Sequence, residues 1–345
     1  MPVMKNVNDK STDVVQLAHG GGGRMMHQLI SEVFASIFDA SGLDCSNDAA
    51  LLPGQQSRIV FTTDSYVVDP LFFPGGDIGC LSVYGTVNDL AMRGARPAYM
   101  SVGFIVEEGF PINDLKRIAE SMRASAQHAG ISIVTGDTKV VDRGHGHGLF
   151  INTAGIGFVD HDLVIGVENV QPDDAIVLSG DIGRHGLAVM ACRQELALET
   201  SIESDCASLA EPILKLIDAR IDIHCLRDLT RGGLASALVE ISESCRAEIV
   251  LNQAGIKVLP QVAAACEILG LDPLYVANEG RFVLFLPAEQ VNLALEVIDR
   301  SCADSKPVVA GRVSAVGNPR VILRNEYGTE RVIDMLSGDQ LPRIC

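Results

Sequence analysis

Residues Arg58-Ile-Val-Phe-Thr-Thr-Asp64 decide the fold class, because a short apolar run ends there in polar residues and a helical pattern follows. The run predicts a β-strand, and residues 77–93, closed by Gly94, predict a helix. A strand-like stretch over residues 99–107 and a second helix over residues 113–130 continue the pattern. Alternation of this kind is typical of an α/β fold or a layered α+β fold.

The same alternation starts again after the polar turn Gln171-Pro-Asp-Asp174, which we interpret as a domain boundary. A chain of 345 residues is long enough for two domains with separate cores. We therefore expect an N-terminal segment (1–40), an N-terminal domain (41–170), a C-terminal α/β domain (171–325) and a tail (326–345). Further predicted elements are strands at 131–135, 149–158, 175–179, 281–286, 308–316 and 321–324, and helices at 24–38, 186–198, 209–218, 233–245 and 288–300.

The composition excludes several classes of function. A net charge of -17 repels nucleic-acid backbones and anionic membranes, and a chain with no Trp and 5% aromatic residues lacks platforms for stacking bases. The first 16 residues lack the apolar core of a signal peptide, and no apolar run is long enough for a membrane span. Nine scattered cysteines without a C-x-x-C pair predict reduced thiols in the cytoplasm and argue against zinc. We therefore expect a cytoplasmic protein that binds small anions.

Five aspartates stand at predicted strand or helix ends among small residues: Asp48, Asp64, Asp89, Asp137 and Asp228. Each one alone is well explained as a helix cap or a turn residue. Carboxylates at one edge of a sheet can instead converge on Mg²⁺, which takes its remaining oxygens from water and phosphates. The five together predict a metal–nucleotide site.

A glycine-rich stretch, His19-Gly20-Gly21-Gly22-Gly23-Arg24, precedes the first predicted helix. Its backbone amides could fold over phosphates at the helix N-terminus, although a flexible linker explains the glycines equally well. It matches neither the Walker A loop nor the Gly-x-Gly-x-x-Gly fingerprint. Arg231-Gly-Gly233 has a similar pattern and the same two interpretations, and His145-Gly-His147 is interpreted as a solvated turn rather than a metal site.

The sequence ends in Pro342-Arg-Ile-Cys345, with a thiol as its last side chain. If residues 337–345 are extended, they span roughly 30 Å. That length suits an arm whose thiol collects a group at one site and delivers it to another. The alternative is a frayed end without a role.

These motifs together resemble the HypE family of hydrogenase maturation factors. The matching motifs are Thr62-Thr-Asp-Ser65, Asn88-Asp-Leu-Ala-Met92, Thr135-Gly-Asp-Thr-Lys-Val-Val141, Asp228-Leu-Thr-Arg-Gly-Gly233, Asn278-Glu-Gly280 and Pro342-Arg-Ile-Cys345. The likeness runs from about His19 to Cys345, and the final tetrapeptide is specific to the family. The aspartate motifs are shared with the wider aminoimidazole ribonucleotide synthetase, or PurM-like, superfamily.

The resemblance implies a two-domain PurM-like fold and a homodimer whose N-terminal domains join in a β-barrel. It also implies an ATP-dependent dehydration in the maturation of [NiFe] hydrogenase. The carbamoyltransferase HypF places a carbamoyl group on the thiol, ATP activates its amide oxygen, and loss of that oxygen leaves a thiocyanate. The cyano group then passes to iron held by the HypC–HypD complex.

The resemblance also assigns roles to individual residues. The implied Mg²⁺ ligands are Asp48, Asp64, Asp89 and Asp228, and the implied ATP site comprises Gly21, Gly22, Thr63, Asp64, Asn88, Asp89, Asp137, Thr138 and Asp228. Cys345 carries the reacting group, and Lys139 and Glu279 match positions that could remove protons from the carboxamide nitrogen. Lys139 could instead contact phosphate, and Glu279 could orient Lys139.

Two other readings of the sequence remain open. Another ATP enzyme of the superfamily, such as a thiamine monophosphate kinase or a selenophosphate synthetase, would share the aspartates but would not need Pro342-Arg-Ile-Cys345. A non-catalytic metal chaperone could use the scattered Cys and His residues, but these lack paired ligand spacing.

Overall fold

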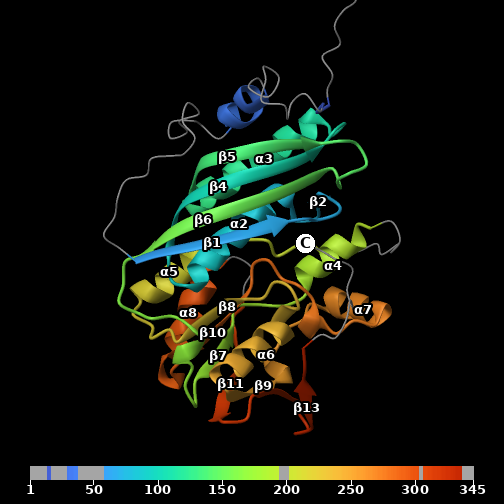
Figure 1. Ribbon diagram of the computed structural model, residues 1–345. Coiled ribbons are helices and arrows are strands. Elements are labelled where there is room, and N and C mark those ends of the chain that lie inside the picture. Colours follow the sequence, from blue (N-terminus) through green and yellow to red (C-terminus); the bar gives the residue numbers. More distant parts are fainter. Residues whose placement is uncertain (1–13, 17–28, 38–57, 194–201, 303–305, 336–345) are drawn as a thin grey trace, which may run out of the picture.

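The computed structural model describes residues 14–16, 29–37, 58–193, 202–302 and 306–335, and two β-sheets organise them (Figure 1). A four-stranded sheet lies in the first half of the chain, and a seven-stranded sheet lies in the second half. A small hairpin of β2 (Phe72–Phe73) and β3 (Gly76–Asp77) follows the first strand. A π-helical turn, η2 (Ile30–Ala35), contacts helix α3.

The four-stranded sheet has one covered face and one open face. Its order is β1 (Arg58–Tyr66), β6 (Leu149–Val159), β4 (Arg96–Glu107) and β5 (Ser132–Val141), and only β4 and β5 are parallel. Helices α2 (Ile78–Met92) and α3 (Ile112–Ala129) pack on one face (Figure 1). Because side chains alternate along a strand, Val102 and Phe104 are buried whereas Ile105 is 43% exposed.

Local signals in the sequence set the ends of both helices. The side chain of Asp77 caps α2 by accepting hydrogen bonds from the backbone N–H of Gly79, at 2.7 Å, and of Cys80, at 3.0 Å. Helix α3 ends at Gly130, which has a φ of 70°, a left-handed conformation that favours glycine. The sequence predicted both the start of α2 at Asp77 and the end of α3 at Gly130.

The seven-stranded sheet is covered on both faces. Its order is β13 (Glu330–Ile333), β12 (Arg320–Arg324), β9 (Ala247–Asn252), β11 (Val308–Val316), β7 (Ala175–Leu178), β10 (Phe282–Leu286) and β8 (Cys225–Asp228). Ile176 and Val177 are both fully buried but belong to different core clusters, one containing α6 and the other α5 and α8. A strand buried on both sides is therefore apolar throughout, as β7 is.

Five helices and four short helical turns complete the described residues of this half of the chain. The helices are α4 (Arg184–Ala191), α5 (Ala210–Asp218), α6 (Gly233–Cys245), α7 (Pro260–Leu269) and α8 (Val291–Ser301). The turns are η3 (Val167–Asn169), η4 (Gln253–Gly255), η5 (Pro273–Tyr275) and η6 (Ala288–Gln290). Helix α2 also packs against α5 and β8, so it joins the two sheets. Within the described ranges, no helix is long and apolar enough to cross a membrane.

Several predicted boundaries are wrong; the helix expected over 186–198, for example, is α4 and ends at Ala191. The strand expected over 131–135 continues as β5 to Val141, because Gly136 fits where a Cβ would lie 2.5 Å from the carbonyl oxygen of Val102. The tail expected from residue 326 instead begins with a hairpin, in which β13 pairs with β12. Asn325 forms this turn by accepting hydrogen bonds from the N–H groups of Tyr327 and Thr329. The predictions for α5, α6 and β11 are confirmed within one residue.

Candidate active site

A hollow opens where the two halves of the chain meet. It is lined by Asp64, Ser65, Tyr66, Gly85, Asp89, Asp228, Thr230, Arg231 and Glu279. Its four acidic residues come from β1, α2, β8 and the turn before β10. Three of the five aspartates that the sequence singled out therefore gather in one place, together with the predicted Glu279.

Asp64 and Asp89 form the part of the hollow that belongs to the first sheet. The hydroxyl of Thr62 donates to Asp89 Oδ2 at 2.8 Å, and the N–H of Ser65 donates to Asp64 Oδ1 at 2.7 Å. Burial raises the pKa of Asp89 above its ordinary value, and the charge of Asp64 raises it further. The hydrogen bond from Thr62 opposes this shift, and it also fixes the direction of the carboxylate.

Asp228 is the most strongly perturbed carboxyl group in the hollow. Burial is the main cause that raises its pKa to about 7, and repulsion from Asp89 and Asp64 adds to the shift. Arg227 opposes the shift only in part. Like charges held together in this way favour a bound cation, which would let all three carboxylates ionise.

Tyr66 and Gly85 complete the wall beside the carboxylates, and the sequence did not identify either. The Tyr66 hydroxyl lies 3.4 Å from Thr86 Oγ1, and burial with the nearby Asp64 charge raises its pKa well above the ordinary value. A Cβ at position 85 would lie 2.3 Å from that hydroxyl oxygen, so glycine is required for the tyrosine to reach the wall. A glycine inside a predicted helix was the available signal.

Asn88 connects α2 to the second half of the chain. Its Nδ2 donates to the carbonyl oxygens of Ala207 at 3.1 Å and Glu279 at 3.3 Å, and its Oδ1 accepts from the N–H of Leu209 at 2.8 Å. Both amide hydrogens are used within the protein. These contacts fix the backbone around Glu279, and the contact of Asn88 with the nucleotide stays a prediction.

His185 is a buried histidine, and its burial should make the stability of the folded protein depend on pH. It is fully buried, its Nδ1 lies 2.9 Å from Ser204 Oγ, and burial lowers its pKa to about 4. The unfolded chain takes up a proton near the ordinary pKa of about 6.5, so stability from this residue falls as the pH drops from 6.5 to 4.

We expect the wild-type protein to lose about 2 kcal/mol more than a His185→Gln variant between pH 7.5 and pH 5. Urea unfolding of both proteins at the two pH values measures this difference. Equal losses would show that His185 does not govern the acid response.

A second group of predicted residues lies away from the hollow. Asp137 and Lys139 stand on the open face of the first sheet, where Lys139 Nζ lies 2.9 Å from Asp137 Oδ2 and lowers the pKa of that carboxyl group. The register pairs Asp137 with Gly103, Gly103 with Asn152, and Asn152 with Ser65. Asp137 is thus three strand spacings, roughly 14 Å, from the hollow at Ser65.

The other predicted residues lie either in the first sheet or outside the described residues. Thr63 is exposed on the open face of the sheet, whereas Thr138 is 3% exposed and points to the helix side. Asp48, Gly21, Gly22 and Cys345 lie outside the described residues. No cluster of three or more His, Cys, Asp or Glu side chains forms a ready metal site in the ranges that the structure covers. The predicted metal site stays a prediction.

The loop that carries His145 and His147 is organised from within. The carboxylate of Glu107 accepts hydrogen bonds from the N–H groups of Gly144, at 2.5 Å, and of Gly148, at 3.0 Å. His145 is exposed, and the ring of His147 lies beside Phe150. The geometry is that of a surface turn, as the sequence indicated.

Comparison with known proteins decides the family. Models of the AIR synthase related protein match this chain over residues 46–159 for the N-terminal domain and 171–324 for the C-terminal domain. The carbamoyl dehydratase HypE of Cupriavidus necator is 48% identical over 332 residues, which cover 96% of this chain and 95% of the relative. The chain belongs to the HypE family. HypE of Escherichia coli is 41% identical and covers 96% of this chain and 99% of its own length.

Solved structures agree with this assignment. A crystal structure of HypE in complex with ATP has a TM-score of 0.92 and 44% identity, and the match covers 96% of this chain and 99% of that one. HypE in a HypE–HypF complex has a TM-score of 0.78 at 44% identity, with 89% and 99% of the two chains covered. A thiamine-monophosphate kinase from Stenotrophomonas maltophilia, at 18% identity and a TM-score of 0.65, shares the fold. The resemblance to the HypE family drawn from the sequence is confirmed, as is the two-domain PurM-like α/β fold.

Proposed function

We propose that this chain uses ATP to dehydrate a carbamoyl group on the sulfur of Cys345, which leaves a thiocyanate. The cyano group would become a ligand of iron in a [NiFe] hydrogenase. The observation that carries the proposal is 48% identity to a carbamoyl dehydratase HypE over nearly the whole chain. The Pro342-Arg-Ile-Cys345 motif, which supplies the thiol, supports it. A relative solved with ATP supports the choice of nucleotide.

The proposed reaction needs a leaving group and a base. Phosphorylation of the amide oxygen by ATP lets that oxygen leave as phosphate, and ADP is the other product. The two protons on the nitrogen must also depart as the carbon–nitrogen triple bond forms. Glu279 lies in the hollow at 5% exposure and suits the role of base, and Lys139 would pass the proton on or hold the phosphate.

Mg²⁺ fits the acidic side of the hollow. Asp64, Asp89 and Asp228 offer the hard oxygen ligands that this ion prefers. Burial and then repulsion from Asp89 and Asp64 raise the pKa of Asp228, and a bound cation would oppose both effects. These residues would hold the ion, and Asp48 would join them. When bound, the ion would neutralise charge on the phosphates, while Arg231 in the rim offers a further cation.

A homodimer would complete the site. Ile59, Phe61 and Ile105 are 64%, 65% and 43% exposed on the open face that also carries Lys139, which is an unusual amount of apolar surface to leave in water. A second copy packed on this face would cover it and bring its own Lys139 to the hollow. This arrangement explains why one chain does not hold Lys139 beside Glu279.

We also propose the partners that such a carrier needs. HypF would load the carbamoyl group, since a HypE relative has been solved in complex with HypF. The HypC–HypD complex would receive the cyano group, and these exchanges would take place in the cytoplasm. The fold shared with thiamine-monophosphate kinase, at 18% identity, carries no argument for a kinase activity.

The decisive test is the intact mass of the protein after incubation with HypF, carbamoyl phosphate and ATP. We expect the gain of one carbamoyl group, then the loss of one water when Mg²⁺ and ATP are supplied to the isolated, loaded protein. Cys345→Ala should show neither change, and Cys302→Ala should behave like the wild type. ATP turnover without any change of mass would overturn the proposal and favour a kinase acting on a small molecule.

A further inference from the structure

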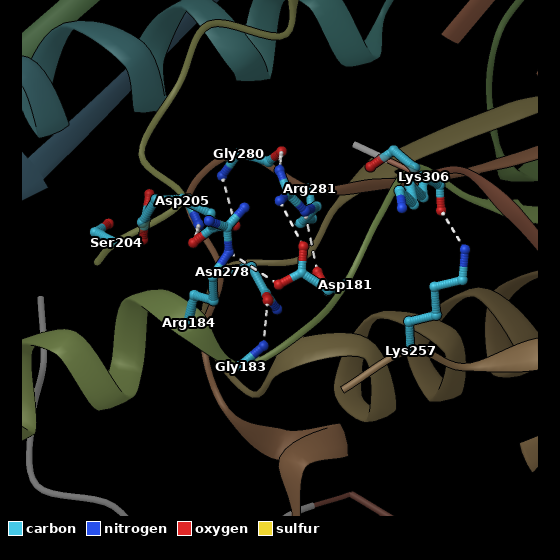
Figure 2. Close-up of polar contacts among 12 residues, drawn as sticks. Asp181, Gly183, Arg184, Ser204, Asp205, Lys257, Asn278, Gly280, Arg281 and Lys306 are labelled. Atoms are coloured by element: carbon cyan, nitrogen blue, oxygen red, sulfur yellow. Dashed lines mark hydrogen bonds and ion pairs between the residues drawn. The ribbon is translucent and has the colours of Figure 1, made fainter. Parts of the chain in front are cut away.

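Asp205 holds the backbone amides on both sides of the Cα atom of Glu279. It is 5% exposed, its Oδ1 accepts from the N–H of Glu279 at 3.3 Å, and its Oδ2 accepts from the N–H of Gly280 at 3.2 Å. Figure 2 shows the carboxylate facing the turn at Gly280. The approach is close, because a Cβ at position 280 would lie 2.0 Å from the carbonyl oxygen of Asp205. Only glycine fits there.

The carbonyl group of Glu279 is held by two further hydrogen bonds. Its oxygen accepts from Asn88 Nδ2 at 3.3 Å and from the N–H of Ala207 at 3.5 Å. The N–H and the carbonyl group of Glu279 are thus both tied to residues 205–207 or to α2. Glu279 itself lines the hollow.

The residues on either side of Glu279 and Gly280 are anchored separately. Asn278 Oδ1 accepts from the N–H of Gly183 at 2.7 Å, and Arg281 Nη2 lies 2.8 Å from Asp181 Oδ1 (Figure 2). Arg281 and Asp181 are 4% and 8% exposed, so this is a buried ion pair. Both flanks are thus fixed without Asp205, and its carboxylate accepts hydrogen bonds from the two central amides.

We propose that Asp205 is a positioning residue that directs the Glu279 carboxylate toward the reacting carboxamide. The inference rests on the proposed role of Glu279 as a base. Two hydrogen bonds to a charged acceptor restrict rotation of the peptide and so fix the Cα–Cβ direction of Glu279. Loss of one bond should let that direction vary, and base catalysis depends steeply on such placement.

Asp205→Asn tests the proposal because the amide keeps one acceptor and presents an N–H₂ group to the other backbone N–H. We expect dehydration of the loaded protein in a single turnover to slow roughly 10-fold. Carbamoyl loading and the affinity for ATP should stay at wild-type values. Glu203→Gln, an exposed change two residues away, should alter none of these.

A double-mutant cycle separates positioning from general support of the fold. In a Glu279→Gln background, Asp205→Asn should slow the residual dehydration no further. An equal slowing in both backgrounds would overturn the inference, as would a wild-type rate in Asp205→Asn itself. If Glu279→Gln dehydrates at the wild-type rate, the proposed base is wrong, a result obtained without any change at Asp205.

Thermal unfolding provides the control for folding. Should Asp205→Asn fail to fold, Asp205→Glu replaces it in the same cycle, because it keeps both acceptor oxygens and displaces them by one methylene. Additive effects of Asp205→Glu and Glu279→Gln would then overturn the inference.

Discussion

Replacing Asp89 by asparagine is expected to lower Mg²⁺-dependent ATP hydrolysis by at least about 100-fold. The change removes one negative charge from a group of carboxylates that would have to hold a doubly charged cation beside the phosphates. It preserves shape, because the hydroxyl of Thr62, now 2.8 Å from Asp89 Oδ2, can donate to an amide oxygen equally well. Phosphate release at saturating ATP measures the effect. Asp218→Asn, an exposed change at the end of α5, is the matched control.

The same substitution should have the opposite effect on stability without metal. Asp89 raises the pKa of Asp228, so its charge opposes ionisation of that neighbour. In EDTA at pH 8 we therefore expect Asp89→Asn to unfold roughly 3 °C above the wild type. Mg²⁺ with ATP should raise the midpoint of the wild type but not of the variant. A variant that is both inactive and less stable in EDTA would indicate damage to the fold instead.

The aspartates could be predicted because their chemistry is local. Asp64, Asp89 and Asp228 each follow a strand-like or helical pattern among small residues, and such positions at a sheet edge favour shared ligands. The strand that carries Asp137 was predicted too short, because Gly136 resembles a strand end in sequence. Its real reason is the close approach to Val102, which only the pairing of β4 with β5 reveals.

Asn88 shows what a sequence cannot supply. Its partners Ala207 and Glu279 lie 119 and 191 residues further along the chain, so its role depends on how the two halves pack. The same holds for Asp205, whose contact with Gly280 spans 75 residues. Asn88 and Asp89 are neighbours in one motif but have different roles. Asn88 joins the two halves of the chain, and Asp89 lines the hollow.

Lys139 and Glu279 lie apart within one chain, so a test of whether two chains share each site gives the second large expected effect, on thiocyanate formation. Lys139→Ala and Glu279→Ala are each expected to lower thiocyanate formation by about 100-fold or more, the usual contribution of an acid–base group. If each site takes Glu279 from one chain and Lys139 from the other, a dimer of the two variants has one intact site. Co-expression at equal levels should therefore restore about one quarter of the wild-type activity, because half the dimers are mixed.

Mixing the wild type with a Lys139→Ala, Glu279→Ala double variant gives the reciprocal result. Across-chain sites leave every mixed dimer inactive, so about one quarter of the activity should survive. Sites built within one chain would keep each wild-type subunit active and leave about one half, and the two single variants would then restore nothing. Differently tagged chains, purified through both tags, isolate the mixed dimer and remove any dependence on expression level. Because both mixtures contain the same side chains in different pairings, their difference reports only which chain supplies Lys139.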